Sequence, residues 1–519
     1  MHTNILDTEV INEVFVTTIP TKYHNDPKVV EAKYDELQKW IKYEAYEEVT
    51  AKDQHILSSR WVVVEKEGKA KARLCVRGFE EIERPQSDSP TASGDSFNIF
   101  MTIAANEGFS LQSLHVTSAF LQGYPLERDV YMKPPPEAQK AGVIWKLKKS
   151  CYGLYDASRK WFMAVKQQLL ELGMKTVTGD DAFFYLRDDN GALLGLCCLH
   201  VDDFLLAGTP SFHKMCSEKL KGRFTFGKIE LEQFKFTGLN INETKEGIFV
   251  DQNDYVQSIE PITLDRVADK NDKLTKEEFK KYRGLTGQLT WAASHTRPDI
   301  SFDTRELSTK NKCATIDDIR KANKVLKKAK KQNVSIKYSK LGKFEDLKLV
   351  SFTDSSYRNA DDATKSVGGR LVLLANKTGQ CSPLIWKSKT IQQVCKSVKS
   401  AETRGLERGI EDSIYFSRII HEIYSGKVYD GKVDNGHLPI EMKIDSKTLH
   451  DSLKSTKAVD EKSMRHIVAW IKQQIEVETV DRIDTISSKE NLADIFTKKD
   501  VKSEDILNVV QNGIVDITI

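Results

Sequence analysis

LLGLCCLHVDDFLLAG (193–208) contains two apolar runs joined by a short polar turn, and the turn carries Asp202 and Asp203. Apolar runs of this length on both sides of a turn predict a β-hairpin with the two aspartates at its tip. Upstream, SLHVTSAFLQG (113–123) predicts another strand, which carries His115. We expect these stretches to form one metal site, with a histidine beside two carboxylates.

Helices are predicted on both sides of this hairpin along the chain. SRKWFMAVKQQLLELG (158–173) has an amphipathic pattern that ends at a glycine, and residues 97–107 and 212–224 also read as helices. Residues 28–60 read as helical too, and two strands around Gly68 follow them. A small sheet with helices on one side is an α+β arrangement.

The composition is that of a folded protein. The chain has 519 residues, too many for one hydrophobic core, so two to four domains are expected. Its 39% hydrophobic and 29% charged residues exclude a disordered chain, and its net charge of +3 says little about partners. The eight cysteines lack zinc-binding spacing and indicate reduced thiols. Without a signal sequence or an apolar run of ~18 residues, we expect an intracellular protein, cytoplasmic or nuclear, that is not secreted and binds no membrane.

Four acidic residues in the second half follow a regular order of predicted elements. Asp354 ends a strand, Glu402 lies in the first turn of a long helix, Asp445 ends a later strand, and Asp494 lies on a terminal helix. Hard divalent cations prefer oxygen ligands, and phosphodiester hydrolysis gains most from two ions about 3.5–4 Å apart. Each residue alone could be an ordinary surface acid. Together, in this order, the four predict a two-metal site.

A basic segment separates the two halves. Residues 320–343 contain ten Lys or Arg and no Asp or Glu. Two interpretations stay open: a solvated helix face followed by a linker, or a patch that tracks a nucleic-acid backbone. In both, this segment is the expected domain boundary.

Short motifs in both halves resemble one family. In the second half these are FTDSSY (352–357), SAETRGL (400–406), KIDSKTLHDSLKSTK (443–457) and ENLADIFTKK (490–499), which are similar to the RNase H domain of copia-type LTR retrotransposons, particularly the animal branch. In the first half the motifs that are similar to copia-type reverse transcriptases, in the family's order, are 61–79, 119–138, 144–162, LHVDDFLLAG (199–208), 236–241 and YRGLTGQLTWAASHTRPDISF (282–302).

The resemblance implies a right-hand polymerase followed by an RNase H-like α/β domain with a mixed sheet. The division that it implies is an N-terminal extension at 1–27, fingers and palm at 28–211, palm end, thumb and connection at 212–318, a basic linker at 319–345, and the RNase H-like domain at 346–519. It further implies an RNA template, a DNA primer, RNA–DNA hybrids and dNTPs as partners, with two Mg²⁺ per active site or Mn²⁺ as an alternative. The oligomeric state is left open.

The resemblance also assigns roles in the palm. Asp202 and Asp203 correspond to two of the family's three metal-binding aspartates, although the hairpin tip reads His200-Val201-Asp202-Asp203 where the family has Tyr-X-Asp-Asp. The third aspartate begins the family's Asp-Val-Lys-Thr-Ala-Phe-Leu strand, and this chain has His115 there. In the second half, Asp354, Glu402, Asp445 and Asp494 match the family's metal-binding residues without a departure.

Three further residues are implied in substrate binding. Phe120 matches the aromatic ring that excludes a ribose 2′-hydroxyl, and its alternative role is that of a core phenylalanine. Lys71 and Arg73 match basic finger residues that neutralise a triphosphate, and their alternative is as exposed strand charges.

The consequence of His115 is a weak site for two Mg²⁺ ions, since one negative charge and up to two oxygen ligands are missing. We expect polymerase activity to be impaired. The alternatives are a decayed element copy, a retained protein that keeps only hybrid binding or RNase H cleavage, and an altered site with Zn²⁺ or Mn²⁺ bound to His115. A non-catalytic nucleic-acid clamp is the rival of a different class. Because no capsid, protease or integrase precedes the polymerase, we expect a fragment or a truncated reading frame.

Overall fold

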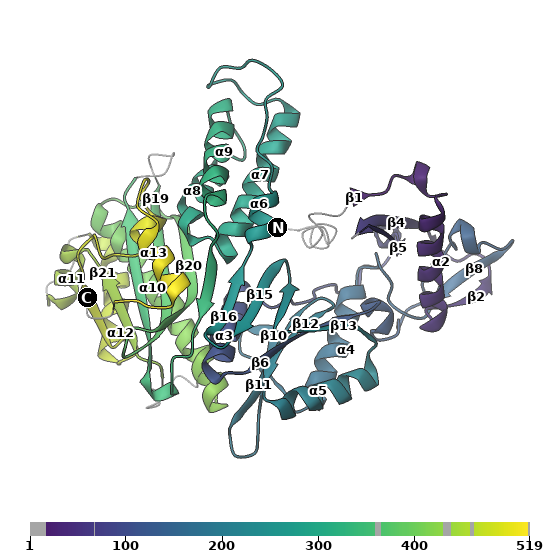
Figure 1. Ribbon diagram of the computed structural model, residues 1–519, viewed down its shortest axis with the longest axis horizontal. Coiled ribbons are helices and arrows are strands. Elements are labelled where there is room, and N and C mark those ends of the chain that lie inside the picture. The colour runs from purple at the N-terminus through teal and green to yellow at the C-terminus, as the bar shows by residue number, and fades with distance from the viewer. Residues whose placement is uncertain (1–16, 67, 359–364, 429–436, 457–460, 517–519) are drawn as a thin grey trace.

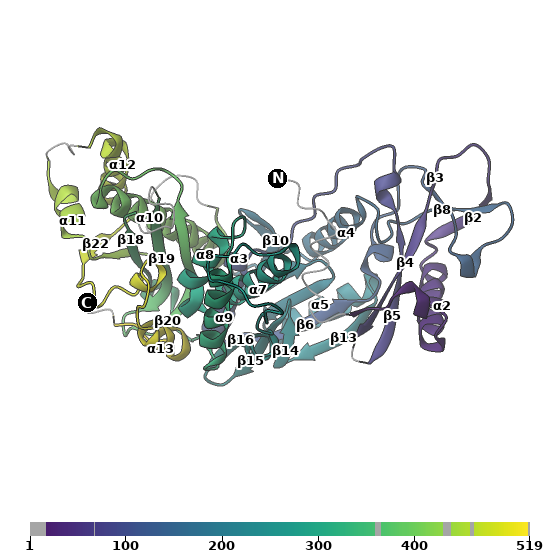
Figure 2. The ribbon, with the colours of Figure 1, turned by 90° about the horizontal axis from the view of Figure 1, so that it is seen from above.

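The structure is a computed structural model, and it describes residues 17–66, 68–358, 365–428, 437–456 and 461–516. Residues 1–16 of the predicted N-terminal extension lie outside the described residues. The molecule is elongated, with the N-terminal strands and helix α2 (Pro27–Lys42) at one end and the helices from α10 (Val398–Ser425) to α13 (Glu504–Asn512) at the other (Figures 1 and 2). The helices from α7 (Lys276–His295) to α9 (Ile316–Lys330) rise between the two ends.

The N-terminal end consists of two small sheets and one helix. The sheets are β1 (Thr17–Thr18), β4 (Ser59–Lys66) and β5 (Lys69–Val76), and β2 (Tyr46–Thr50), β8 (Val143–Leu147), β7 (Tyr131–Met132) and β3 (Ile56–Leu57), beside α2 (Pro27–Lys42). The prediction of helix throughout 28–60 is wrong beyond Lys42. Glu44 has φ 49°, which ends a right-handed helix, and Tyr46 in β2 then stacks on Trp145 of β8 at 3.7 Å between ring centroids.

A six-stranded sheet forms the centre of the molecule. Its order is β13 (Phe226–Leu231), β6 (Ser110–Val116), β12 (Asp203–Gly208), β11 (Leu193–His200), β10 (Asp180–Arg187) and β9 (Lys175–Val177). The predicted hairpin is β11–β12, and β6 pairs with β12 on its other edge. The predicted helices are α3 (Gly94–Glu107), α4 (Ala157–Glu171) and α5 (Pro210–Arg223).

Both faces of this sheet are covered, so the prediction of helices on one side is wrong. Alternate strand residues point to opposite faces: Phe184, Cys197 and Leu206 pack in the cluster that contains α4 and α5, whereas their neighbours pack in the cluster that contains α3. The continuous apolar runs of β11 and β12 allow this double burial.

The basic segment is built into the fold. A four-stranded sheet has the order β14 (Gln233–Phe236), β15 (Leu239–Thr244), β16 (Gly247–Asp251) and β17 (Ser335–Tyr338), and the helices beside it are α6 (Asn253–Ser258), α7 (Lys276–His295), α8 (Ser301–Thr309) and α9 (Ile316–Lys330). Residues 319–345 therefore form most of α9 and all of β17 instead of an open linker. Ile319, Val325 and Ile336 are buried there, which explains the order, while the domain division itself stays a prediction.

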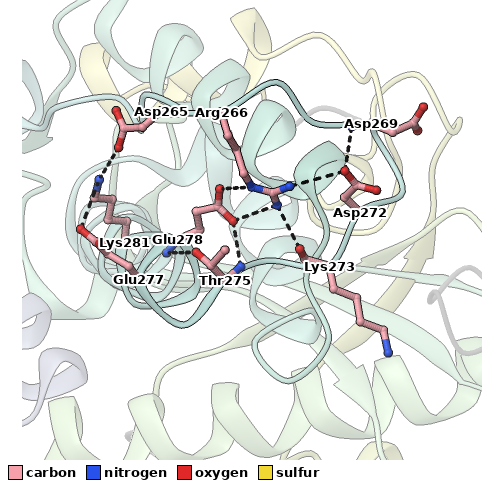
Figure 3. Close-up of polar contacts among 9 residues, drawn as sticks. All are labelled: Asp265, Arg266, Asp269, Asp272, Lys273, Thr275, Glu277, Glu278 and Lys281. Carbon is pink, nitrogen blue, oxygen red and sulfur yellow. Dashed lines mark hydrogen bonds and ion pairs between the residues drawn. The ribbon is translucent and has the colours of Figure 1, made fainter.

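An ion-pair network fixes the start of α7 (Figure 3). Thr275 and Glu278 form a reciprocal capping box, and the Arg266 guanidinium contacts Glu278 with 2.9 Å between Nε and Oε1. The hydrogen bond from Arg266 lowers the pKa of the Glu278 carboxyl to about 2. This network anchors the loop that precedes the α7–α9 helices.

The C-terminal end is a five-stranded mixed sheet. Its order is β20 (Cys381–Ile391), β19 (Ser366–Asn376), β18 (Leu347–Ser356), β21 (Ile440–Ile444) and β22 (Arg482–Thr485); the first three are antiparallel and the last two run parallel to β18. The helices are α10 (Val398–Ser425), α11 (Lys447–Lys454), α12 (Arg465–Glu476) and α13 (Glu504–Asn512). The terminal helix predicted for 491–498 is one 3₁₀ turn at Asp494–Phe496, because the backbone leaves the helical region at Thr497.

One hydrophobic cluster joins the central sheet to the C-terminal sheet. It runs from Phe100 and Leu205 through Ile336 to Leu371 and Leu406. Hydrogen bonds reinforce this junction, among them that from Asn98 Nδ2–H of α3 to the Leu384 carbonyl of β20 at 2.8 Å. Among the described residues, no helix is long and apolar enough to cross a bilayer.

Candidate active sites

The first candidate site lies at the C-terminal ends of β6 and β11 and at the start of β12. The register places Asp203 directly opposite His115 on β6 and opposite His200 on β11, so the three side chains form one row on the same face. Asp202 lies in the turn before β12, after Val201, whose φ of 52° is left-handed. The predicted hairpin thus brings His115, Asp202 and Asp203 together.

The imidazole lies between the two carboxylates. His115 Nδ1 is 2.8 Å from Asp203 Oδ1, and His115 Nε2 is 3.7 Å from Asp202 Oδ2. One ligand atom from each residue lies within 4.8 Å of the others. The tip itself is held by Trp161, whose Nε1–H donates to the Val201 carbonyl at 2.6 Å. This cluster is arranged as a metal site is, with one imidazole in the ligand set.

The histidine changes the charge of the cluster. The hydrogen bond to Asp203 raises the pKa of His115. Restricted solvation, with repulsion from Asp203, raises the pKa of Asp202 to about 6, while His115 acts in the opposite direction. The imidazole thus partly neutralises two carboxylates that would otherwise repel each other.

The three residues predicted to bind substrate differ in their contacts and in their exposure beside this cluster. Arg73 lies over the Tyr152 ring at 5.5 Å, Tyr152 contacts the Phe120 ring at 5.0 Å, and Arg73 also lowers the pKa of Asp202. Phe120 is buried, with 6% of its surface exposed. Lys71 is exposed on the same strand as Arg73. The sequence analysis did not predict a role for Tyr152. The only signal available was its position within the motif 144–162.

The second candidate site joins three elements of the C-terminal sheet. Asp354 lies near the end of β18, Glu402 in the first turns of α10, and Asp445 directly after β21. One carboxylate oxygen from each lies within 4.8 Å of the others. Gly405 on α10 permits this approach, because a Cβ there would lie 2.3 Å from Ser355 Oγ. Hard divalent cations bind oxygen ligands, and this cluster supplies three of them from three separate elements.

Burial and neighbouring charges raise the pKa values of Glu402 and Asp354 in this cluster. Burial, followed by the charges of Asp354 and Asp445, raises the pKa of Glu402 to about 9. Burial also raises the pKa of Asp354. Because like charges in one buried site disfavour ionisation, a cation would stabilise the ionised cluster.

Lys498 links the fourth predicted carboxylate, that of Asp494, to the rest of the site. Lys498 Nζ is 2.8 Å from Asp494 Oδ1 and 3.6 Å from Asp354 Oδ2, and the Thr497 hydroxyl donates to Asp354. Burial raises the pKa of Asp494 to about 6 although Lys498 lowers it. The sequence reasoning missed Lys498 and Thr497; the spacing of four residues between Asp494 and Lys498 was the available signal.

Comparisons with known proteins agree with this architecture. Residues 43–275 match the family described as reverse transcriptase (RNA-dependent DNA polymerase). The chain is 25% identical over 479 residues to the retrovirus-related Pol polyprotein from transposon RE2 of Arabidopsis thaliana, covering 85% of this chain and 31% of the relative. It is 26% identical over 518 residues to the Pol polyprotein from transposon TNT 1-94 of Nicotiana tabacum, covering 91% and 36%. The chain thus spans about a third of the length of these curated relatives.

Solved structures show the same fold. The foamy viral protease–reverse transcriptase in complex with double-stranded DNA has a TM-score of 0.53 at 14% identity, covering 92% of this chain and 71% of that one. The same viral protein in complex with an RNA/DNA hybrid has a TM-score of 0.50 at 13% identity, covering 93% and 56%. The predicted α+β polymerase with an RNase H-like domain is confirmed. The animal branch stays a prediction. The matched family and these relatives identify residues 43–275 as a reverse transcriptase of the copia-type LTR retrotransposon group.

Proposed function

We propose that the chain is a retrotransposon-derived RNA-directed DNA polymerase with an RNase H unit, in which the hydrolytic site is complete and the polymerase site is impaired. The observation that carries this proposal is the difference between the two clusters. The palm cluster contains His115 beside two aspartates, whereas the C-terminal cluster contains three carboxylates within 4.8 Å of one another. RNA template, DNA primer, RNA–DNA hybrid and dNTPs are the proposed partners.

The C-terminal residues fit a pair of Mg²⁺ ions, with Mn²⁺ as the alternative. Asp354, Glu402 and Asp445 offer oxygen ligands, and Asp494 adds a fourth carboxylate beside them. Bound divalent ions would supply a lowered pKa for the attacking water and stabilisation of the leaving oxygen.

The remaining residues of that site orient the ligands. The Thr497 hydroxyl donates to Asp354, and Lys498 holds Asp494 and Asp354 from one side. These contacts keep the carboxylates in one geometry before substrate arrives. The RNA strand of a hybrid is the proposed substrate, and its hydrolysis is the proposed reaction.

The palm residues do not fit a pair of Mg²⁺ ions. Asp202 and Asp203 supply two carboxylates, but a bridging carboxylate is absent because His115 occupies its place and hydrogen-bonds Asp203 at 2.8 Å. Mg²⁺ prefers oxygen ligands and near-ideal octahedral geometry, so an imidazole is a poor replacement. We therefore propose that nucleotide addition is severely weakened.

A paired assay on one preparation tests this proposal. Purified chain is given a labelled RNA–DNA hybrid and, separately, a primed RNA template with dNTPs, both in Mg²⁺ and in Mn²⁺. We expect hybrid cleavage and little or no extension. Asp354→Asn and Asp445→Asn should each lower cleavage on the order of 10³-fold, because each removes an ionised ligand.

Two outcomes would overturn the proposal. Robust extension in Mg²⁺ by the unaltered chain would show that the palm site works. Hybrid binding without cleavage in either metal would favour the rival, a non-catalytic nucleic-acid clamp. Asp203→Asn is the matched control, since it alters the other cluster and should leave hybrid cleavage unchanged.

A further inference from the structure

The palm cluster has the geometry of a different kind of metal site. Asp203 can only accept a hydrogen bond when ionised, so His115 Nδ1–H is the donor across their 2.8 Å contact. In the neutral imidazole the Nε2 lone pair is then directed away from Asp203, and a metal ion that binds there replaces any proton held on Nε2. Nε2 lies 3.7 Å from Asp202 Oδ2, close enough for one ion to contact both atoms after a small adjustment.

The arrangement of carboxylate, imidazole and metal is a recurrent one. In protein metal sites a ligating histidine donates its second N–H to a carboxylate, which orients the ring and makes the ligand nitrogen more basic. Asp203 has that position relative to His115. The order of the strands holds it there, since His115 and Asp203 are directly opposite in the β6–β12 register.

Charge and access also suit one transition-metal ion. Two carboxylates and a neutral imidazole balance the charge of one divalent ion, whereas a pair of ions would leave two positive charges unbalanced. The side chains of His115, Asp202 and Asp203 are 52%, 31% and 29% exposed, so an ion can enter from solvent and water can complete its coordination. Imidazole ligands favour Zn²⁺ and its neighbours over Mg²⁺.

We propose that the palm cluster is a mononuclear transition-metal site, with His115 Nε2 and Asp202 as ligands and Asp203 as the residue that orients the imidazole. The substitution at position 115 thereby changes the metal preference of the palm from Mg²⁺ to ions such as Zn²⁺ or Co²⁺. The site stands on the palm geometry alone and does not depend on cleavage by the C-terminal unit.

Metal binding to the full chain, without nucleic acid, tests the proposal. The background carries Asp354→Asn and Asp445→Asn, which remove the second cluster. Co²⁺ is added and its visible d–d absorption is recorded, then Zn²⁺ is added in competition, and Mg²⁺ affinity is measured by calorimetry. We expect a Co²⁺ spectrum of low coordination number, its loss on stoichiometric Zn²⁺ addition, and Zn²⁺ binding at least ~100-fold tighter than Mg²⁺.

Variants of the cluster give the decisive comparison. His115→Asn and Asp202→Asn should abolish the Co²⁺ spectrum, and Asp203→Asn should weaken binding about 10–100-fold. His450→Asn is the matched control, because His450 also lies near one carboxylate, 3.9 Å from Asp451, but belongs to no cluster of three ligands among the residues that the structure describes. It should leave binding unchanged. Circular dichroism checks that each variant is folded.

The proposal is overturned by any of three results: Mg²⁺ binding as tight as Zn²⁺, a Co²⁺ spectrum unaffected by His115→Asn, or equal losses in the His450→Asn control. A further variant keeps the test independent of one substitution. His115→Asp restores an all-carboxylate cluster and should reverse the preference, weakening Zn²⁺ and strengthening Mn²⁺ and Mg²⁺ binding.

Discussion

The palm cluster and the C-terminal cluster each bring three ligand residues together, but the palm cluster contains an imidazole and the C-terminal cluster contains carboxylates alone. Each holds three ligand atoms within 4.8 Å of one another. In the palm, His115 and Asp203 come from paired strands of one sheet, where register aligns them, and Asp202 lies in the turn before β12. In the C-terminal unit they come from β18, the helix α10 and the end of β21, and tertiary packing aligns them.

This difference explains what each cluster tolerates. A substitution on a strand keeps its register, so His115 retains its place opposite Asp203 and finds a hydrogen-bond partner. A histidine on α10 would have to fit beside Asp354 and Asp445 in a buried space, as Glu402 is only 9% exposed. The palm can therefore change its ligand chemistry without losing its fold, whereas the C-terminal cluster cannot easily do so.

The largest expected effect is on DNA synthesis, when an aspartate replaces His115 so that both clusters contain carboxylates alone. His115→Asp should raise dNTP incorporation on a primed RNA template on the order of 10³-fold, because it restores the missing carboxylate. Single-turnover extension in Mg²⁺ measures it. Hybrid cleavage should not change. No gain in extension would mean that other residues of the palm also prevent synthesis.

The next largest effect is on the pH dependence of stability, which the buried carboxylates of the C-terminal cluster lower when no metal is bound. The pKa of Glu402 is raised to about 9, above its unfolded value, so the folded chain keeps a proton that the unfolded chain releases between about pH 4.5 and 9. Stability should therefore fall as pH rises through this window. Glu402→Gln removes that slope and should raise Tm at pH 8 on the order of 2–5 °C, with little effect near pH 5.

Calorimetric melting with EDTA at several pH values measures this difference. Added Mg²⁺ should stabilise the unaltered chain more than the Gln variant. A Glu402→Gln variant that melts lower than the unaltered chain at pH 8 without metal would show that the carboxylate is not crowded.

A smaller effect is expected at Lys498, which pairs with Asp494 and Asp354 in the C-terminal cluster. Lys498→Met removes a positive charge 3.6 Å from Asp354, so divalent cations should bind the C-terminal cluster about 3–10-fold more tightly. Calorimetric titration with Mn²⁺ measures it. Lys498→Arg keeps the charge and should change affinity less than about twofold. Weaker binding in Lys498→Met would mean that the lysine chiefly positions Asp494.

The smallest effect is expected far from both clusters. Glu278→Ala removes the ion pair with Arg266 and half of the capping box, which should cost about 1 kcal/mol and lower Tm by about 1–3 °C. Differential scanning calorimetry checks it. Hybrid cleavage per folded molecule should stay unchanged. A large loss of cleavage would show that the start of α7 contributes to substrate binding.

Local patterns in the sequence predicted much of the fold and the ligands. The apolar runs around Asp202 gave the hairpin, and the order of Asp354, Glu402 and Asp445 gave the second cluster, since strand ends and a helix start leave few arrangements. The His115 substitution was visible because neighbouring letters bracket it. Its hydrogen bond to Asp203 depends on register, which one strand alone does not specify.

Features set by tertiary contacts were harder to predict. The helix predicted for 28–60 ends at Lys42, because the left-handed Glu44 and the pairing of β2 with β8 outweigh local helix preference. The buried face of α9 around Val325 was not predicted, because the many basic residues of 320–343 obscure its apolar pattern. Lys498 and Tyr152 were missed because their importance comes from neighbours distant in sequence.

The shared hydrophobic cluster makes the palm part of the support of the C-terminal sheet. Helix α3, which contains Phe100, and strand β17 pack against that sheet, so the two share one core. Deletion of the palm would therefore expose apolar surface of the C-terminal sheet. Mutations that unpack the palm would disturb both candidate sites at once, while those confined to its metal cluster would change only one.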